Sequence, residues 1–183
     1  MNRLASPQQL RASLLRWSLF VIPAVMLLGY LSGQVGDDAS SPWFQALDKP
    51  AIYPPAITFP IVWSVLYFMM GLALAMVCAA WGARWRGWAI GAFVVQFALN
   101  LAFTPTFFGA HDLRAALAVI VALAIVLAVT VWLFFKVRRA AGWLMVPYLA
   151  WVLFAGVLNY EFLRMNPDAD AMDYDRGVQR IEF

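Results

Sequence analysis

Two amide side chains interrupt an otherwise apolar stretch near the middle of the chain, residues 88–108. Gln96 and Asn100 are four residues apart, and at 100° per residue they share a helical face with Phe103 and Phe107. Polar amides are costly in hydrocarbon and tend to face the interior of a helix bundle. The spacing therefore predicts an inward face that combines amides with aromatic rings. Such a face could bind a ligand, or its amides could simply join neighbouring helices by hydrogen bonds.

Two other apolar stretches carry residues that suit the same surface. In residues 59–80, Trp63 and Tyr67 lie on one helical stripe, and in residues 142–163 a row contains Trp151 and Ala155 with Asn159 beside it. A small residue between an aromatic ring and an amide leaves room for a flat molecule, although Ala155 could equally make room for a neighbouring helix. Aromatic walls with a few polar groups are typical of sites for apolar ligands.

The residue inventory argues against most other site chemistries. The chain has one cysteine, Cys78, and one histidine, His111, so we expect no disulfide within the chain and no metal site rich in cysteine or histidine. No Ser/His/Asp cluster, phosphate-binding loop or pair of carboxylates within an apolar stretch is evident, so no catalytic residue is assigned and enzymatic activity stays an open question. The 13 Lys and Arg residues are spread along the loops and ends of the chain, which disfavours nucleic acid as a partner.

The elements that would position these residues are membrane helices. Of the 183 residues, 64% are hydrophobic and 13% are charged, and the mean hydropathy is +0.75, whereas soluble domains carry about 25% charged residues. Runs of about 20 apolar residues predict transmembrane helices. The sequence contains five such runs, at residues 13–33, 59–80, 88–108, 115–135 and 142–163. We predict an all-α membrane protein, a bundle of five transmembrane helices.

The apolar runs divide the chain into one membrane domain and two flanking segments. The predicted parts are an N-terminal cytoplasmic segment at residues 1–12, a five-helix domain at 13–165 with a long loop at 34–58, and an acidic polar tail at 166–183. The first apolar run exceeds the usual h-region of a signal peptide, about 7–15 residues, and no A-x-A cleavage site follows it. We therefore expect the first helix to be retained.

The distribution of positive charge predicts the orientation in the membrane. Eight basic residues lie in the N-terminal segment and the second and fourth loops: Arg3, Arg11, Arg16, Arg84, Arg86, Lys136, Arg138 and Arg139. Five lie on the other side: Lys49, Arg114, Arg164, Arg176 and Arg180. Because basic residues favour the cytoplasmic side, we expect a cytoplasmic N-terminus, with the long loop and the C-terminus outside.

The third apolar run also carries a stripe of small residues opposite its amides. This stripe consists of Gly87, Gly91, Ala98 and Ala102. Small residues at this spacing allow helices to approach closely in lipid. The stripe could form a homodimer interface, or it could pack against another helix of the same chain.

Several short motifs along residues 43–165 resemble the tryptophan-rich sensory protein and translocator protein family. The first loop contains W-F-x-x-L-x-K-P at 43–50 and P-P at 54–55, followed by F-P-I-V-W-S-V-L-Y-F-M-M-G at 59–71. The third run contains Q-x-x-x-N at 96–100 and T-P-T-F-F-G-A at 104–110. The fifth run contains V-P-Y-L-A-W at 146–151 and L-N-Y at 158–160. Each motif is short, but their joint order along the chain is specific.

The resemblance implies a five-helix membrane protein, often dimeric, that binds porphyrins and other flat hydrophobic ligands in a pocket under the first loop. The positions that match the family pocket are Trp63, Tyr67, Asn100, Trp151 and Ala155. With the helical faces described above, the expected ligand-binding set is Trp63, Tyr67, Gln96, Asn100, Phe103, Trp151, Ala155 and Asn159. The expected lid over the pocket includes Trp43, Lys49, Pro50, Pro54 and Pro55. The resemblance also implies an integral membrane location, which we expect to be a bacterial inner membrane.

The chain departs from the family pattern where tryptophans are usual. Ala51, Ile52 and Tyr53 fill the loop segment that usually holds one or two tryptophans, and Phe103 replaces another. These changes weaken the expectation of family-like porphyrin affinity. They also weaken the case for photo-oxidative degradation of porphyrin, a reaction that has been proposed for some members.

A short pattern near the end of the fifth run matches one proposed for sterol contact. Leu158, Tyr160 and Arg164 fit L-x-Y-x₃-R, a pattern of low specificity. An arginine just beyond a transmembrane helix also commonly reaches toward lipid headgroups. Both interpretations stay open at this point.

Two functions follow from these observations. The first is a regulator or carrier in tetrapyrrole metabolism that holds a porphyrin or heme-like ligand without a covalent cofactor. The alternative is a structural or accessory subunit of a larger membrane assembly, such as a pigment–protein complex, whose pocket has decayed or is filled by lipid. The expected partners are the lipid bilayer, a hydrophobic small molecule, and either a second copy of the chain or other subunits.

Overall fold

A computed structural model describes residues 7–36 and 39–169 of the chain, and these residues form helices joined by loops. The segments in chain order are α1 (Pro7–Ser32), α2 (Pro42–Ala46), α3 (Thr58–Cys78), α4 (Arg86–Thr104), the π-helix η1 (Pro105–Gly109), α5 (Leu113–Val137) and α6 (Arg139–Met165). Helix α1 begins inside the predicted N-terminal segment 1–12. Residues 1–6 of that segment and 170–183 of the predicted tail lie outside the described residues.

Five helical stretches are long and apolar enough to cross a membrane. They are α1, α3, α4 together with η1, α5 and α6. Each overlaps one of the apolar runs in the sequence, and α2 lies in the long loop between the first two spans. The predicted fold class, an all-α bundle of five transmembrane helices, is confirmed for the described part of the chain.

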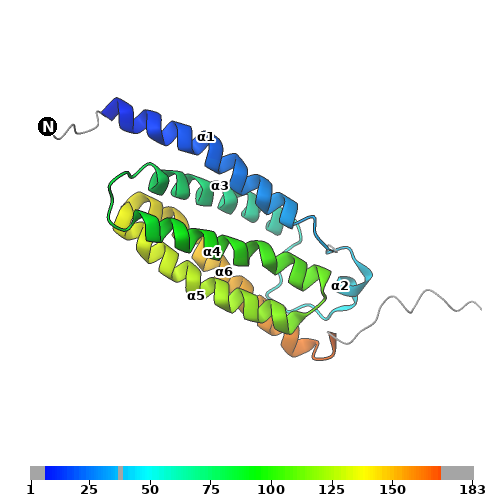
Figure 1. Cartoon of the computed structure of the whole chain (residues 1–183). Helices are drawn as coiled ribbons and strands as arrows, with labels where there is room; N and C mark the ends of the chain where they lie inside the picture. Colours follow the sequence, from blue (N-terminus) through cyan, green and yellow to red (C-terminus); the bar gives the residue numbers. More distant parts are fainter. Residues whose placement is uncertain (1–6, 37–38, 170–183) are drawn as a thin grey trace, which may run out of the picture.

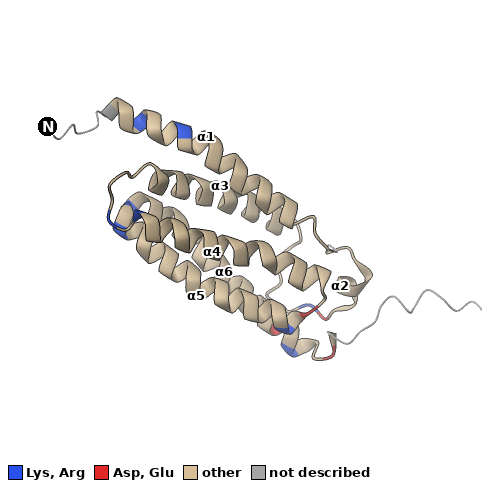
Figure 2. Cartoon of the chain, viewed as in Figure 1, with Lys and Arg blue, Asp and Glu red and all other residues tan. Residues whose placement is uncertain are grey.

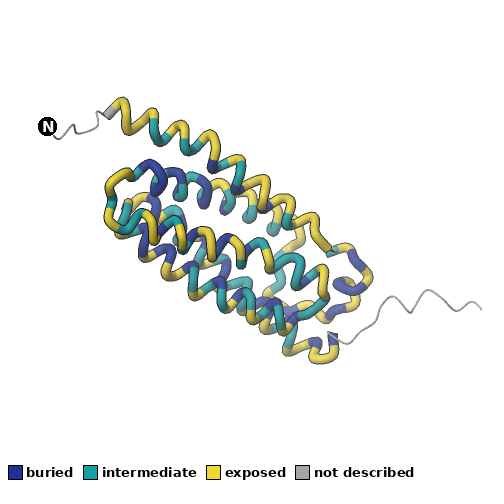
Figure 3. Tube along the Cα trace, viewed as in Figure 1, coloured by how far each residue is buried: buried dark blue, intermediate teal, exposed yellow. Residues whose placement is uncertain are grey.

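The five spans form one bundle with α1 at its edge (Figure 1). Helix α3 packs between α1 and α6, and α5 packs against both α4 and α6. Along its length α1 remains largely exposed (Figure 3). Leu15, Leu19 and Phe20 on α1 are exposed apolar side chains, as expected for a helix whose outer face contacts lipid.

Two glycines let α1 and α3 approach each other closely. A Cβ atom added at Gly71 of α3 would lie 2.8 Å from the backbone Cα of Ile22, and one added at Gly29 of α1 would lie 2.5 Å from the Tyr67 ring. Contacts this short essentially never occur at real Cβ atoms, so a side chain at Gly71 would displace the backbone of α1, and one at Gly29 would displace the Tyr67 ring. The second contact fixes the Tyr67 ring against α1.

Pro105 does not simply bend α4, because the helix continues through it as the wider turn η1. The Ala110 N–H donates to Pro105 O at 2.8 Å, a bond that spans five residues. Proline lacks the N–H that would otherwise bond to Leu101 O. The Ser32 hydroxyl at the end of α1 donates to that carbonyl at 2.7 Å instead. The backbone group freed by the proline is thus satisfied by a neighbouring helix.

The long first loop covers one end of the bundle (Figure 1). Ser41 caps α2 by accepting a hydrogen bond from the Phe44 N–H at 3.2 Å. The buried side chains Trp43, Phe44 and Leu47 of this loop pack against the ends of η1, α5 and α6. Among the apolar residues that they meet are Phe107, Leu113, Leu158 and Phe162.

The two ends of the molecule differ in charge, because the loop end carries both signs, including the basic residues Lys49, Arg114 and Arg164 (Figure 2). At the end away from the long loop, the described charges are basic: Arg11, Arg16, Arg84, Arg86, Lys136, Arg138 and Arg139. The acidic residues among those described are Asp48, Asp112, Glu161 and Asp168, all at the loop end.

The close contact at Gly71 makes a stability prediction. Gly71→Ala would force its new methyl group into the backbone of α1, and overpacking of this kind typically costs about 1–3 kcal/mol. We expect a lower midpoint of thermal unfolding in detergent. The matched control is Gly156→Ala in α6, where a Cβ would meet only Ile120 Cγ2 at 3.8 Å. Equal midpoints for the two variants would contradict the proposed role of the contact.

Candidate ligand-binding site

Contacts between the inward faces of α3, α4 and α6 connect four of the eight predicted ligand-binding residues, Trp63, Tyr67, Gln96 and Asn100. The Tyr67 hydroxyl donates to Asn100 Oδ1 at 3.0 Å, which joins α3 to α4. The Trp63 ring stacks on Tyr67 with 5.3 Å between centroids and 27° between planes. An aromatic pair from one helix thus lies directly against an amide from the next.

Gln96 lies deeper in the bundle and has a partner that the sequence interpretation missed. Its side chain is fully buried, and its Oε1 accepts a hydrogen bond from the Tyr148 hydroxyl at 3.1 Å. The Tyr148 ring also meets the edge of Trp63, with 6.3 Å between centroids. The signal for Tyr148 was present, because it precedes Trp151 by three residues and therefore shares its helical face.

Four buried polar atoms in this region have no hydrogen-bond partner among the described residues. They are Gln96 Nε2, Trp151 Nε1 and both amide atoms of Asn159, Nδ2 and Oδ1. An unpaired buried polar group costs about 1–3 kcal/mol, so native proteins rarely keep several together without a use for them. All three residues belong to the predicted ligand-binding set, and between them they offer two amide donors, one indole donor and one amide acceptor.

Aromatic rings pack against two predicted residues of the site, Trp151 and Phe103. The Trp151 ring contacts Phe59 edge-on with 6.0 Å between centroids, and it contacts Phe154 with 5.4 Å between centroids. Phe103 packs against Phe107 at 5.8 Å and contacts both the main core and the apolar cluster under the loop. Ala155 is half-buried against the main core.

The inward residues of α6 extend along the bundle axis. Tyr148, Trp151, Ala155 and Asn159 are spaced by three or four residues, and the eleven steps from first to last span about 16 Å at 1.5 Å per residue. Asn159 lies about one turn before Phe162, which packs under the loop. The candidate site is therefore elongated, running from the Gln96–Tyr148 pair toward the loop.

The predicted lid residues occupy the loop that covers this end of the bundle. Trp43 is buried and stacks on His111, with 4.4 Å between ring centroids. The Lys49 ammonium lies 5.3 Å from the centroid of the Phe44 ring. Of the prolines, Pro50 is buried, Pro54 is half-buried and Pro55 is exposed.

Tyr53 supplies an aromatic ring to the loop segment in which the family usually has tryptophan. Its ring lies 5.5 Å from Phe59 and 5.7 Å from Phe162, so it bridges the start of α3 and the end of α6. Burial raises the pKa of the Tyr53 hydroxyl above its ordinary value. The loop thus keeps an aromatic contact with both helices.

The sterol-like pattern does not form one surface. Leu158 is buried in the apolar cluster under the loop, whereas Tyr160 and Arg164 are exposed. The Arg164 guanidinium forms an ion pair with Glu161 at 2.6 Å. The three residues therefore point to different surroundings.

A surface groove lies elsewhere, on the outer side of the bundle between α5 and α6. It encloses about 490 Å³, and its wall includes Val121, Ile125 and Leu153. None of the eight predicted ligand-binding residues lines it. The groove is apolar and faces outward, as expected for a surface in contact with lipid chains.

The side chains of the site limit what it can offer a ligand. Within residues 7–36 and 39–169, no three His, Cys, Asp or Glu side chains are grouped so that they could hold a metal ion. Polar contacts to a ligand would come from amide, hydroxyl and indole groups, and most of the surface would come from aromatic rings.

Comparison with known proteins places the chain in a family. The profile of the TspO/MBR family matches residues 20–165. The chain is 40% identical over 132 residues to the tryptophan-rich sensory protein of Cereibacter sphaeroides. The matched residues cover 70% of this chain and 82% of that protein.

Two further relatives come from different branches of life. The chain is 36% identical over 143 residues to the tryptophan-rich protein TspO of Chlorobaculum tepidum, covering 78% of this chain and 90% of the relative. It is 35% identical over 140 residues to the translocator protein of Sus scrofa, covering 75% of this chain and 83% of the relative. The resemblance drawn from the motifs is thus confirmed, and the chain belongs to the TspO/MBR family.

Proposed function

We propose that this membrane protein binds a porphyrin or a similar flat tetrapyrrole between α3, α4 and α6, and that it acts as a regulator or carrier of that ligand. The observation that carries the proposal is the set of unpartnered buried polar atoms on Gln96, Trp151 and Asn159. They lie along an aromatic face and provide directional contacts in otherwise apolar surroundings.

The chemistry of the face suits a flat amphiphilic ring system. Indole and phenol rings stack on, or meet the edges of, planar aromatic molecules. A tetrapyrrole adds pyrrole nitrogens and polar substituents that can pair with indole and amide groups. The elongated row along α6 provides contacts for both the ring and its substituents.

The relatives support a role in sensing or transport. Their names describe a sensory protein and a translocator protein, and the matched region includes all the predicted ligand-binding residues. Both names fit a protein whose main act is to bind and release a small molecule.

The small-residue stripe on α4 supports a homodimer. Gly87, Gly91, Ala98 and Ala102 are all exposed, and a Cβ at either glycine would meet no atom within 4 Å. This face is therefore left uncovered by the other described helices. We propose that a second copy covers it, because small residues permit the close van der Waals contact that drives helix association in lipid.

The separation of charge supports a cytoplasmic N-terminus. The end of the bundle that carries only basic residues among those described would face the cytoplasm, and the loop end would face outward in a bacterial inner membrane. A reporter enzyme that works only outside the cytoplasm should then be active when fused after Phe183, and one that works only in the cytoplasm should be inactive. Activity of the reporter that works only in the cytoplasm would contradict this orientation.

The dimer proposal predicts the effect of added bulk. Gly91→Leu combined with Ala98→Leu should sharply reduce cross-linking between copies in membranes, because the larger side chains hold the helices apart. The exposed position of both residues means that the fold itself should tolerate the change. Dimer levels equal to wild type would exclude this face as the interface.

The ligand site predicts a specific pattern in a porphyrin titration followed by quenching of tryptophan fluorescence. Trp151→Ala removes a large ring and should weaken binding by roughly 1–3 kcal/mol, about 5- to 150-fold. Asn159→Leu should weaken binding by about 0.5–1.5 kcal/mol, roughly 2- to 12-fold. Because Asn159 has no protein partner to lose, the same change should leave stability equal or higher.

The control for this titration is Trp132→Ala. Trp132 is an exposed residue of α5 that packs against Trp85, at the opposite end of the bundle from the loop. Its loss should change affinity by less than about twofold. Folded Trp151→Ala and Asn159→Leu variants with wild-type affinity would contradict the ligand site. Stable co-purification with other membrane proteins would then favour the accessory-subunit alternative.

A further inference from the structure

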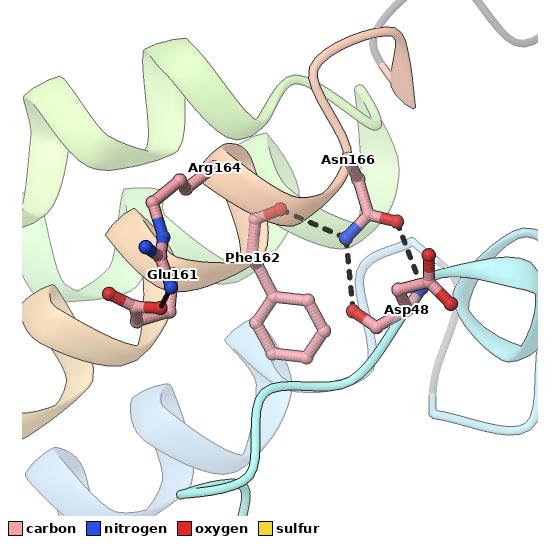
Figure 4. A network of polar contacts seen from close by, with 5 residues as sticks. All are labelled: Asp48, Glu161, Phe162, Arg164 and Asn166. Atoms are coloured by element: carbon pink, nitrogen blue, oxygen red, sulfur yellow. Dashed lines mark hydrogen bonds and ion pairs between the residues drawn. The ribbon is translucent and has the colours of Figure 1, made fainter.

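The residues directly after α6 hold the first loop by its backbone (Figure 4). The Asp48 N–H donates to Asn166 Oδ1 at 2.8 Å, and Asn166 Nδ2 donates back to Asp48 O at 3.0 Å. The same Nδ2 also donates to Phe162 O, one turn back in α6, at 2.9 Å. The Asn166 side chain is buried and uses both its donors and its acceptor in these contacts.

Two more hydrogen bonds fix the short segment that follows. The Trp43 indole N–H donates to Ala169 O at 3.4 Å, and Arg114 Nη2 at the start of α5 donates to Pro167 O at 3.0 Å. Residues 166–169, which we call the clasp, thus join the loop to the ends of α5 and α6. The partners Asp48 and Asn166 are 118 residues apart in sequence.

We infer that Asn166 is a positioning residue that keeps the lid closed over the ligand site and thereby sets the rates at which ligand enters and leaves. This inference rests on the proposed function. Asn166 is seven residues beyond Asn159, about two helical turns, and its polar atoms are all engaged with backbone. It therefore acts through the loop rather than by touching the ligand.

The amide supplies a restraint that the aromatic cluster cannot. Ring contacts such as Phe44 with Phe162, at 5.7 Å, are weakly directional and would tolerate sliding of the loop. The Asn166 amide instead recognises one donor and one acceptor of a single residue, which fixes the loop in register.

The restraint reaches the rest of the lid through a short, stiff segment. Asp48 lies two residues before Pro50, and the Tyr53 N–H donates to Pro50 O at 2.9 Å in the turn that follows. Proline fixes its own φ angle, so holding Asp48 also holds the chain from Pro50 to Tyr53. Tyr53 then packs on Phe59 and Phe162 above the site.

A lid that must open before ligand can enter or leave, which we call a gate, has a characteristic effect on the binding rates. If ligand passes only when the lid is open, weakening the closed state raises the association and dissociation rates together. Affinity then changes little, because the closed state is weakened equally with and without ligand. Loss of a direct ligand contact would instead raise the dissociation rate alone.

The test uses the full-length protein in detergent with protoporphyrin IX as the probe, and rates are measured by stopped-flow quenching of tryptophan fluorescence. Asn166→Ala should raise both rates by about tenfold while the Kd stays within about threefold. Asn166→Asp places a carboxylate oxygen against the carbonyl oxygens of Asp48 and Phe162, to which the Asn166 Nδ2 donates in the wild type, so it should raise both rates at least as much.

The matched control is Glu161→Gln. It breaks the Glu161–Arg164 ion pair at the end of α6, which shares a groove with Pro50, Ala51 and Ile52 of the loop. It removes none of the hydrogen bonds that join the loop to the clasp (Figure 4). Exposed pairs contribute little to stability, so both rates should stay within about twofold of wild type. A rate increase in this control equal to that of Asn166→Ala would overturn the assignment to the clasp.

Hydrogen exchange separates failure of the gate from failure of the ligand proposal. Without any ligand, amide exchange in residues 47–53 should be faster in Asn166→Ala than in wild type, while exchange in the middle of α5 should be unchanged. Absence of porphyrin binding by wild type would reject the proposed function. The exchange test would still show whether Asn166 holds the loop closed. Unchanged loop exchange, or a higher dissociation rate with an unchanged association rate, would overturn the inference.

Discussion

The absence of water in the bilayer core is the constraint on which the rest of this structure depends. Each polar group in a span must find a partner inside the protein or bear the cost of lacking one. The carbonyl freed by Pro105 receives the Ser32 hydroxyl, and the Thr130 hydroxyl donates to Val126 O at 2.8 Å within its own helix. Against this background, unpaired atoms on Gln96, Trp151 and Asn159 stand out, because they are buried, close to aromatic rings, and on inward faces of the bundle.

The bundle and its loop play different mechanical roles. Close contacts at glycines hold α1 against α3 and press the Tyr67 ring toward Asn100, which gives one wall of the site a fixed shape. The loop is held by an apolar cluster and by a few directed hydrogen bonds from the clasp. Breaking a few hydrogen bonds costs far less than separating packed helices, and this difference is the reason why we place the proposed gate in the loop and not in the bundle.

Membership of the TspO/MBR family explains the architecture, and the particular residues of this chain modify the lid. Tyr53 provides a ring where the family usually has tryptophan, and it contacts both Phe59 and Phe162. A phenol offers less aromatic surface than an indole. The contact between loop and bundle is thus made here by a smaller ring.

The sequence by itself determined the five spans, because apolar length and composition are local properties that a bilayer selects directly. It also indicated which faces of the third and fifth spans turn inward, because helical periodicity is local too. Only the tertiary structure decided the partners: Tyr148 with Gln96 across 52 residues, Ser32 with Leu101, and Asn166 with Asp48. These pairings depend on how far each helix is displaced along its neighbours and on the path of the loop. Both are set by packing of the whole bundle, and no short stretch of sequence encodes them.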